Sequence, residues 1–292
     1  MSELMKAVTA KNYGNPSVLE IKEIPKPIIT ENEILIKVYS TTVNRTDTGI
    51  LTAEYFVSRI YSGLLRPKLP SPGTDFAGIV ESCGINVTNF KPGDKVFGFY
   101  DEGISSQAQF MKINSQGPVE IMPKGLSFNE AAASLEGAHY GYNFINKVKI
   151  NAGAKVLIYG ASGSIGSALL QLCLNLNLEV TAVCGTNAVE LIKSFGVKKV
   201  IDYTKEDFTS TIEPQDFVFD AVGKSRFSIC KKILKQKGIY ISSELGPKGE
   251  NLFLALFTPL FGEKKVIFPI PSNCKRTVKM MKGLIEKGEY KA

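Results

Sequence analysis

The second half of the chain alternates apolar strand patterns with helical patterns, and this alternation restricts the fold more than any other feature. Five short apolar runs have the length and composition of buried parallel strands: 156–159, 179–183, 199–201, 217–219 and 239–241. Apolar residues recur at helical spacing over 165–176 and 189–195. Strands that alternate with helices build βαβ units around a parallel sheet. We therefore predict a doubly wound α/β domain over residues 125–270.

The first 124 residues carry a different pattern, which is typical of a β domain. Runs such as 33–39 and 76–81 are rich in β-branched and apolar residues, and turns containing Pro and Gly separate them. The segment 52–70 is irregular, and we interpret it as a loop or a short helix. A capping-box pattern at 127–130 marks the point where helical spacing begins. The sequence thus predicts a separate N-terminal β domain over residues 1–124.

Composition excludes several classes of protein. The chain has 292 residues, of which 44% are hydrophobic and 22% charged, as in an ordinary globular protein of about two domains. No apolar run is long enough to span a membrane, and the start lacks the apolar core of a signal peptide. Five widely spaced cysteines indicate neither a disulfide framework nor a zinc cluster. Reduced thiols favour a cytoplasmic protein.

The positive charge is concentrated near the end of the sequence. The net charge is +7, and residues 263–292 hold eight Lys or Arg against three acids. Such a segment can bind nucleic acid or a membrane surface. However, Val278, Met281, Leu284 and Ile285 share one helical stripe with lysines opposite, which is typical of a solvated helix face. No nucleic-acid module accompanies it, so we expect no specific nucleic-acid partner.

The strongest local motif is a glycine-containing turn between the first predicted strand and helix of the α/β domain. It reads Tyr159-Gly-Ala-Ser-Gly-Ser-Ile-Gly166, with alanine in the first glycine slot of the dinucleotide fingerprint. Gly163 lets the backbone approach a pyrophosphate, and Gly166 lets the helix pack on the strand. A tight turn without a ligand is the alternative. The turn assigns these residues to a cofactor: Ala161, Ser162, Gly163, Ser164, Ile165 and Gly166.

The end of the second strand of this domain bears on the choice of dinucleotide. NAD sites usually place Asp or Glu there to bind the ribose 2′-hydroxyl. This strand instead continues into Gly185, Thr186 and Asn187, without an acid. Thr186 and Asn187 offer donors to a 2′-phosphate. Lys193 offers a cation, or it belongs to a solvated helix face. The sequence favours NADPH as cofactor over NADH.

Several motifs, taken in order, resemble the medium-chain dehydrogenase/reductase superfamily, in its zinc-independent quinone oxidoreductase-like and enoyl reductase-like branch. They are Asn44-Arg-Thr-Asp47, Pro72-Gly-Thr-Asp-Phe-Ala-Gly-Ile-Val80, Phe90-Lys-Pro-Gly-Asp-Lys-Val96, the glycine turn and Asp220-Ala-Val-Gly223. The resemblance implies a GroES-like β-barrel domain followed by a Rossmann domain. It also adds four residues to the cofactor set: Tyr140, Tyr203, Val222 and Gly223.

The resemblance also bears on the last residues and on assembly. Family members continue past the helix predicted near 273–287, so segment 271–292 resembles the start of a return to the first domain. On this comparison the chain is expected to be cut short. We further expect a homodimer.

The same resemblance argues against a catalytic zinc ion. The branch of the superfamily that binds zinc uses Cys, His and Cys, and the matching positions here are Asn44, Thr74 and Glu136. Zinc prefers about three N, S or carboxylate ligands and an open site, which this set does not provide. The expected activity is hydride transfer from NADPH to a quinone or to the C=C bond of an enone or enal, acceptors that need no metal.

Three residues are candidates for catalysis. Asn44 is expected to hydrogen-bond the carbonyl of the acceptor, unless it only bonds its own loop. Tyr55, together with Tyr61, is expected to line the substrate mouth or to donate a proton, unless it only packs at the barrel edge. His139 is a candidate acid, unless it merely satisfies a local hydrogen bond.

Two other functions stay open at this point. One is a zinc-free protein similar to alcohol dehydrogenases that acts on another carbonyl substrate. The other is a sensor or structural protein that binds NADPH without turnover.

Overall fold

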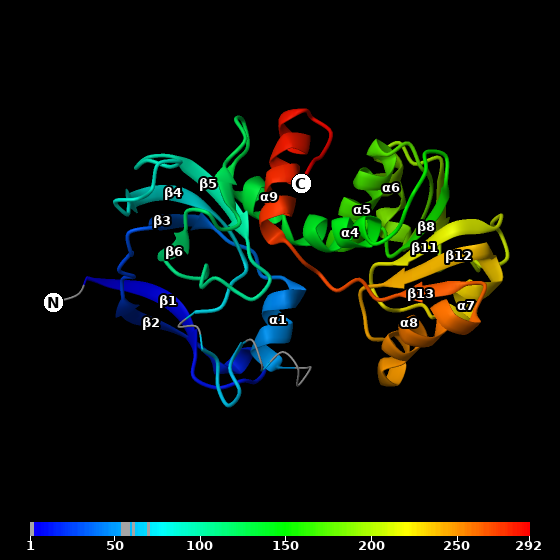
Figure 1. Ribbon diagram of the computed structural model, residues 1–292, viewed down its shortest axis with the longest axis horizontal. Helices are drawn as coiled ribbons and strands as arrows, with labels where there is room; N and C mark the ends of the chain where they lie inside the picture. Colours follow the sequence, from blue (N-terminus) through cyan, green and yellow to red (C-terminus); the bar gives the residue numbers. More distant parts are fainter. Residues whose placement is uncertain (1–2, 54–58, 60–61, 69–70) are drawn as a thin grey trace. The chain divides into compact units, whose positions relative to one another are not determined.

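The computed structural model describes residues 3–53, 59, 62–68 and 71–292 (Figure 1). The contacts within the chain divide it into two units. Unit 1 combines Met1–Glu136 with Asn273–Ala292, and unit 2 comprises Gly137–Ser272. The division therefore falls at the first residue of helix α4 (Glu136–Asn146).

Unit 1 is built from antiparallel sheets. Its five-stranded sheet has the order β6-β3-β4-β5-β7, with strands β3 (Glu33–Ser40), β4 (Asp75–Cys83), β5 (Lys95–Phe99), β6 (Phe110–Asn114) and β7 (Val119–Ile121). Strands β1 (Leu4–Ala10) and β2 (Leu19–Pro25) form a separate antiparallel pair. Alternate residues of the large sheet, such as Ile34 and Ile36, face a shared apolar core, as the period of a half-buried strand requires.

Among the described residues, unit 1 contains the whole of the α-helices α1 (Arg45–Thr52), α3 (Phe128–Ala133) and α9 (Cys274–Glu286). The predicted capping box is present at α3, where Ser127 and Glu130 bond each other's backbone N–H groups. On α9 the predicted apolar stripe faces inward, because Val278 and Met281 are fully buried and the helix packs against β5 and β7.

Unit 2 contains the predicted parallel sheet, with the strand order β10-β9-β8-β11-β12-β13. Its strands are β8 (Lys155–Tyr159), β9 (Glu179–Cys184), β10 (Lys199–Asp202), β11 (Gln215–Asp220), β12 (Leu234–Ser242) and β13 (Lys265–Ile267). This is the 3-2-1-4-5-6 order of doubly wound dinucleotide-binding sheets. The direction of winding reverses between β8 and β11, which are hydrogen-bonded neighbours. The fold predicted for this half of the sequence is confirmed.

Helices cover both faces of this sheet (Figure 1). On one face, Val156 and Ile158 share a core with α4, α5 (Ser164–Asn175) and α6 (Val189–Ser194). On the other face, Leu157 shares a core with α7 (Phe227–Cys230) and α8 (Glu250–Phe261). The continuous apolar run in β8 thus reflects burial on both sides.

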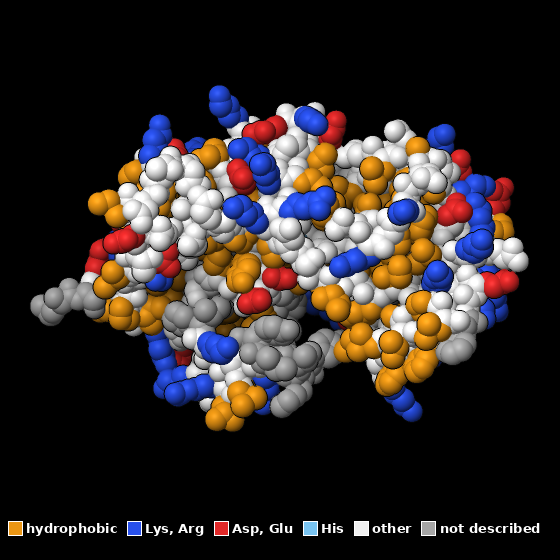
Figure 2. Space-filling view, viewed as in Figure 1, with side chains coloured by type: hydrophobic (Ala, Val, Ile, Leu, Met, Phe, Trp, Pro, Cys, Tyr) orange, Lys and Arg blue, Asp and Glu red, His pale blue; other side chains and the backbone are white. Residues whose placement is uncertain are grey.

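Helix α8 was not predicted from the sequence, because it is apolar on nearly all sides and has no amphipathic period. Its inner residues Leu254 and Ala255 pack on the sheet. Its outer face leaves five large apolar side chains 46–70% exposed: Leu252, Phe253, Leu256, Phe257 and Leu260. Figure 2 shows the apolar patch over this helix at the lower right. In the described part of the chain, no helix is both long and apolar enough to cross a bilayer.

Candidate functional site

A pocket of about 670 Å³ lies at the carboxyl ends of the central strands of unit 2. This is the edge of a doubly wound sheet where ligands bind, beside the point where the winding reverses. Seven of the predicted cofactor residues line it: Ser162, Gly163, Gly185, Thr186, Asn187, Tyr203 and Val222. The sequence analysis missed six further lining residues: Tyr159, Gly160, Cys184, Ala188, Thr204 and Lys224.

The turn between β8 and α5 contains three glycines, and its geometry requires glycine at Gly160 and Gly166. Gly160 has φ of +81°, and a Cβ there would lie 2.4 Å from Val222 Cγ1. A Cβ on Gly166 would lie 2.1 Å from the Gly160 carbonyl oxygen, so only glycine permits this helix–strand contact. At Gly163 the nearest atom to such a Cβ is 3.6 Å away. Gly160 therefore makes the left-handed turn, whereas Ala161, in the first slot of the fingerprint, is fully buried.

The N-terminus of α5 provides the electrostatic part of this site. The helix begins at Ser164, with Ile165 and Gly166 in its first turn, and its N-cap residue, Gly163, makes no side-chain cap bond. Unsatisfied N–H groups and the helix dipole make such an end favourable for phosphate. The pocket, the glycine turn and this helix end together fit the pyrophosphate of a dinucleotide.

The other end of the pocket contains a carboxylate that the sequence analysis did not find. No acid ends β9, as predicted, but Asp202 ends the neighbouring strand β10 and pairs in register with Cys184. Asp202 accepts hydrogen bonds from Thr186 Oγ1 (2.6 Å) and Thr204 Oγ1 (2.7 Å). These bonds, that of Thr186 first, lower the pKa of Asp202 to about 2. An ionised carboxylate thus bonds two residues that line the pocket, Thr186 and Thr204.

The cation at this pocket is not the predicted one. Lys193 forms an ion pair with Glu190 at 2.9 Å on the exposed side of α6, and its side chain is 54% exposed. Lys224 lines the pocket instead, in the turn that follows β11. Asp220 holds this turn, because it accepts backbone bonds from Val222 (3.2 Å) and Gly223 (2.8 Å). Burial raises the pKa of Asp220, and these bonds oppose the rise.

Two further candidates lie on helix α4. His139 is fully buried, and Tyr140 meets it edge-on with the ring centroids 5.5 Å apart. The backbone oxygen of His139 accepts a bond from the Asn143 side chain at 2.8 Å. The described lining of the cofactor pocket includes neither residue.

In unit 1, Asn44 begins helix α1. Its Oδ1 accepts from the Asp47 backbone N–H at 2.9 Å, and its own N–H donates to Asp47 Oδ2 at 3.2 Å, which completes a capping box. Its amide nitrogen lies within hydrogen-bond distance of Thr42 Oγ1 (3.1 Å), Thr74 Oγ1 (2.7 Å) and Asp75 Oδ2 (3.1 Å). An amide has two protons for these three acceptors. Binding a substrate carbonyl would therefore require Asn44 to exchange an existing bond.

Three carboxylates lie buried in the same network: Asp47, Asp75 and Glu136. Burial raises the pKa of Asp47 to about 6. Burial also raises the pKa of Asp75 well above its usual range, and the charge of Glu136 adds to this rise. Glu136 Oε1 accepts from Thr46 Oγ1 at 3.1 Å. Asp47 and Asp75 therefore favour their protonated forms more than exposed carboxyls do.

The three positions that match the zinc ligands of the other branch do not fit a zinc ion. The amide of Asn44 donates to the hydroxyl of Thr74, so these two side chains hydrogen-bond each other. An amide nitrogen and a hydroxyl are poor zinc ligands, and Glu136 alone does not complete a site.

A smaller cavity of about 210 Å³ lies within unit 1 beside α1. Asp47 is one of its polar lining residues, and Ile50 and Leu51 contribute apolar surface. Tyr55 and Tyr61, the predicted residues of the substrate mouth, lie outside the described residues.

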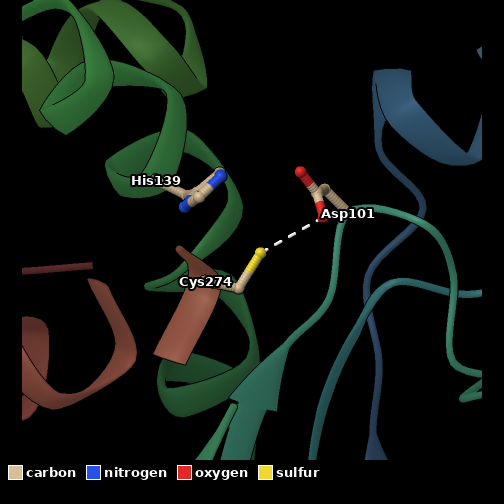
Figure 3. Close-up of side chains that lie close together, drawn as sticks. All are labelled: Asp101, His139 and Cys274. Carbon is tan, nitrogen blue, oxygen red and sulfur yellow. Dashed lines mark hydrogen bonds between the residues drawn. The ribbon is translucent and has the colours of Figure 1, made fainter. Parts of the chain in front are cut away.

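One cysteine contact is visible in Figure 3, where Cys274 Sγ lies 3.2 Å from Asp101 Oδ1. This bond joins the first residue of α9 to the segment that follows β5. Burial, the largest cause, raises the pKa of the Cys274 thiol to about 12. The thiol is therefore protonated at neutral pH and acts as a structural donor rather than a nucleophile.

Comparison with known proteins agrees with this architecture. Residues 30–130 match the alcohol dehydrogenase GroES-like domain family. The chain is 31% identical over 258 residues to 2-methylene-furan-3-one reductase of Solanum lycopersicum, covering 84% of this chain and 64% of that protein. It is also 31% identical to the chloroplastic quinone-oxidoreductase QR1 of Triphysaria versicolor, covering 84% and 77%. The chain thus spans slightly less than two thirds of the first relative and more of the second.

Solved structures share the fold over nearly the whole chain. The quinone oxidoreductase from Coxiella burnetii has a TM-score of 0.85 at 24% identity, covering 98% of this chain and 89% of that one. The Escherichia coli quinone oxidoreductase complexed with NADPH has a TM-score of 0.78 at 23% identity, covering 97% and 89%.

Proposed function

Because the chain belongs to the medium-chain dehydrogenase/reductase superfamily, in its quinone oxidoreductase-like branch, we propose that it transfers hydride from NADPH to a quinone or an α,β-unsaturated carbonyl. The glycine turn carries this proposal, since a Cβ on Gly166 would collide with the Gly160 backbone and Gly163 leaves room beside α5. The names of two relatives, a furanone reductase and an NADPH-dependent alkenal/one oxidoreductase, support the acceptor class.

The residues of unit 2 bind and orient the dinucleotide. The first turn of α5 receives the pyrophosphate, and Lys224 adds a positive charge at the same pocket. The bound nicotinamide supplies the hydride. Asp220 holds the turn that carries Val222 and Gly223 through its two backbone bonds.

On the acceptor side, we propose Asn44, Tyr55 and His139 as catalytic residues. Asn44 stabilises the oxygen on which negative charge develops, by exchanging one of its amide bonds for the acceptor carbonyl. Tyr55 and His139 are the candidate proton donors. No zinc takes part, because the Asn44, Thr74 and Glu136 set supports hydrogen bonding rather than metal ligation.

The direct test is oxidation of NADPH in the presence of a small panel of quinones and 2-alkenals. Turnover with at least one acceptor is expected, and it should survive strong chelation. Stoichiometric zinc that is lost together with activity would contradict the metal-free mechanism. Tight cofactor binding without turnover on any acceptor would favour a sensor instead.

We also propose that the protein forms a homodimer through the outer face of α8. Five large apolar side chains are exposed there, and the adjacent strand β13 ends the sheet with no second strand partner among the described residues. A second copy would cover both the apolar face and the open edge. Light scattering should show that Leu256→Glu converts dimers to monomers. Leu191→Glu, at an exposed leucine on α6, is the matched control.

A cytoplasmic location is proposed from the cysteines, all five of which are free thiols. The names of some relatives include chloroplastic and mitochondrial forms. Fluorescence microscopy of the full-length gene product carrying a C-terminal tag decides between these locations.

A further inference from the structure

We propose that Asp202 limits the preference for NADPH over NADH. It does so by holding the hydroxyls of Thr186 and Thr204, at one end of the pocket, as hydrogen-bond acceptors toward the ligand. The proposal rests on the proposed dinucleotide-binding function. It concerns a residue that does not itself line the pocket but acts through two residues that do, Thr186 and Thr204. Asp202 is therefore a positioning residue.

Asp202 binds both threonines through separate oxygen atoms. Thr186 Oγ1 donates to Oδ2 at 2.6 Å, and Thr204 Oγ1 donates to Oδ1 at 2.7 Å. The Thr204 backbone N–H also donates to Oδ1, at 3.0 Å. The Asp202 side chain is only 10% exposed, and its strand is fixed beside β9 by the register of the sheet. The arrangement is thus a rigid part of the fold.

The proton count decides what these hydroxyls can offer a ligand. Each hydroxyl has a single proton, and an ionised carboxylate can only accept. Thr186 and Thr204 can therefore each donate to Asp202. The two hydroxyl oxygens also lie 2.9 Å apart, so one threonine can instead donate to the other, and in either arrangement both protons stay within the group formed by Asp202, Thr186 and Thr204. Toward a ligand in the pocket, the two hydroxyl oxygens can therefore only accept hydrogen bonds.

A ribose 2′-hydroxyl and a 2′-phosphate respond differently to such a surface. A 2′-hydroxyl can donate to the oxygen of Thr186 or Thr204. A 2′-phosphate is acceptor-only when fully ionised, so it gains no bond from these hydroxyls and is also repelled by the charge of Asp202. Lys205 Nζ, 3.4 Å from Asp202 Oδ2, offsets part of that charge but is 68% exposed and therefore screened. The absence of an acid at the end of β9 favours NADPH over NADH, and Asp202 with its two threonines makes this difference in affinity smaller.

The test compares Asp202→Asn with the parent protein by calorimetric titration of NADPH, NADH, adenosine 2′,5′-bisphosphate and adenosine 5′-monophosphate. The two adenosine fragments report on this end of the pocket independently of catalysis. The variant removes the charge, and its amide can donate to one threonine, which frees that hydroxyl to donate to a ligand. The ratio of NADPH to NADH affinity is expected to rise on the order of tenfold. The ratio for the two fragments should rise in parallel.

The chain provides a matched control at Asp207. Asp207 accepts from the backbone and hydroxyl of Thr209 at 2.8 Å each, which repeats the local bonds between Asp202 and Thr204. The described lining of the pocket includes neither Asp207 nor Thr209. Asp207→Asn should therefore leave both ratios unchanged. As a second variant, Thr186→Val should weaken NADH more than NADPH, because it removes an acceptor for the 2′-hydroxyl.

The outcomes separate this proposal from the one it rests on. An unchanged or lower NADPH to NADH ratio in Asp202→Asn, with both cofactors bound, overturns the role of Asp202 and leaves the proposed function standing. An equal rise in Asp207→Asn also overturns it, because the effect would then be one of net charge. If the parent protein binds neither cofactor, the proposed function fails and the role of Asp202 fails with it.

Discussion

The cofactor pocket of unit 2 and the Asn44 network of unit 1 are both polar, but they are built in opposite ways. The pocket is formed largely by backbone: glycines that permit close approach, a helix end and a turn held by Asp220. The Asn44 network is formed by side chains that bond one another, with the carboxyls of Asp47 and Asp75 buried inside it.

This difference indicates which property of the protein each region controls. The pocket presents the N-terminus of α5 and the cation of Lys224, and both favour the binding of an anion. The Asn44 network is already hydrogen-bonded, and its buried carboxyls hold protons more tightly than exposed ones. Changes in the pocket should therefore alter ligand affinity, whereas changes in the network should alter stability, pH dependence and turnover.

The largest effect is expected from the glycine turn. A Cβ on Gly166 would meet the Gly160 oxygen at 2.1 Å, so Gly166→Ala should displace α5 and lower the affinity for NADPH at least about 100-fold, at a stability cost of about 1–3 kcal/mol. Gly163→Val has room for its Cβ and should lose affinity with little change in stability. Calorimetric titration and urea unfolding measure the two quantities separately.

Gly283→Ala on α9 is the control for these variants. Nothing lies within 4 Å of a Cβ at that position. Alanine in a helix should stabilise the protein by about 0.4–1 kcal/mol and leave cofactor affinity unchanged. Unchanged NADPH affinity in Gly163→Val would contradict the contrast drawn between the two units, because ligand binding would then not depend on close approach to the backbone of the pocket.

The second largest effect concerns turnover and Asn44. Asn44→Ser retains a helix cap but loses the amide that bonds Thr74 and Asp75, so stability should fall by about 1–3 kcal/mol. Turnover should fall up to about 100-fold, or about 2.7 kcal/mol, while NADPH affinity remains the same. Steady-state kinetics with the best acceptor measures this.

The capping box of α3 provides the matched variant for Asn44. Ser127→Ala removes a comparable cap and should cost about 1 kcal/mol of stability without lowering turnover. Normal turnover in Asn44→Ser would contradict the catalytic role of Asn44 and show that it acts only as a helix cap.

Sequence reasoning recovered what depends on local pattern. The strands of unit 2 were found because buried parallel strands are continuously apolar, and the turn after β8 was found because its backbone requires glycine. Helix α8 was missed because it lacks a period. Asp202 was missed because its partner Thr186 lies 16 residues away, just after the neighbouring strand β9, and only the sheet register brings them together. The bonds from Asn44 to Thr74 and Asp75 span 30 and 31 residues and were equally out of reach.

A third prediction tests the buried carboxyls through pH. The pKa of Asp47 rises from 3.8 to about 6 on folding, so the folded state holds a proton that the unfolded state releases between these values. Its contribution to stability is therefore fully present below about pH 4 and is lost as the pH rises through 6. Asp47→Asn should be more stable than the parent at pH 7, by up to about 3 kcal/mol, and the gap should close toward pH 4. Urea unfolding at both values measures the gap. A gap independent of pH would show that Asp47 does not titrate in this range.

The smallest expected effect sharpens the comparison at the pocket itself. Gly185 directly follows β9, and a Cβ there would meet Tyr203 Oη at an ordinary contact distance of 3.5 Å, so Gly185→Asp should fold normally. The new carboxylate stands where NAD sites place an acid, so NADH should bind more tightly and NADPH less tightly, a change of a few-fold in each.

Because Asp202 bonds the neighbouring Thr186, the two acids share one end of the pocket and their effects on the ratio of NADPH to NADH affinity should not add. In an Asp202→Asn background, Gly185→Asp should therefore shift the cofactor ratio more than it does alone, since it no longer acts on a surface that already disfavours the 2′-phosphate. Titration of both cofactors against the four proteins of this cycle measures the coupling. Strict additivity would mean that Asp202 does not act at the site of the 2′-group, and a gain of NADPH affinity in Gly185→Asp would mean that the end of β9 does not face the ribose.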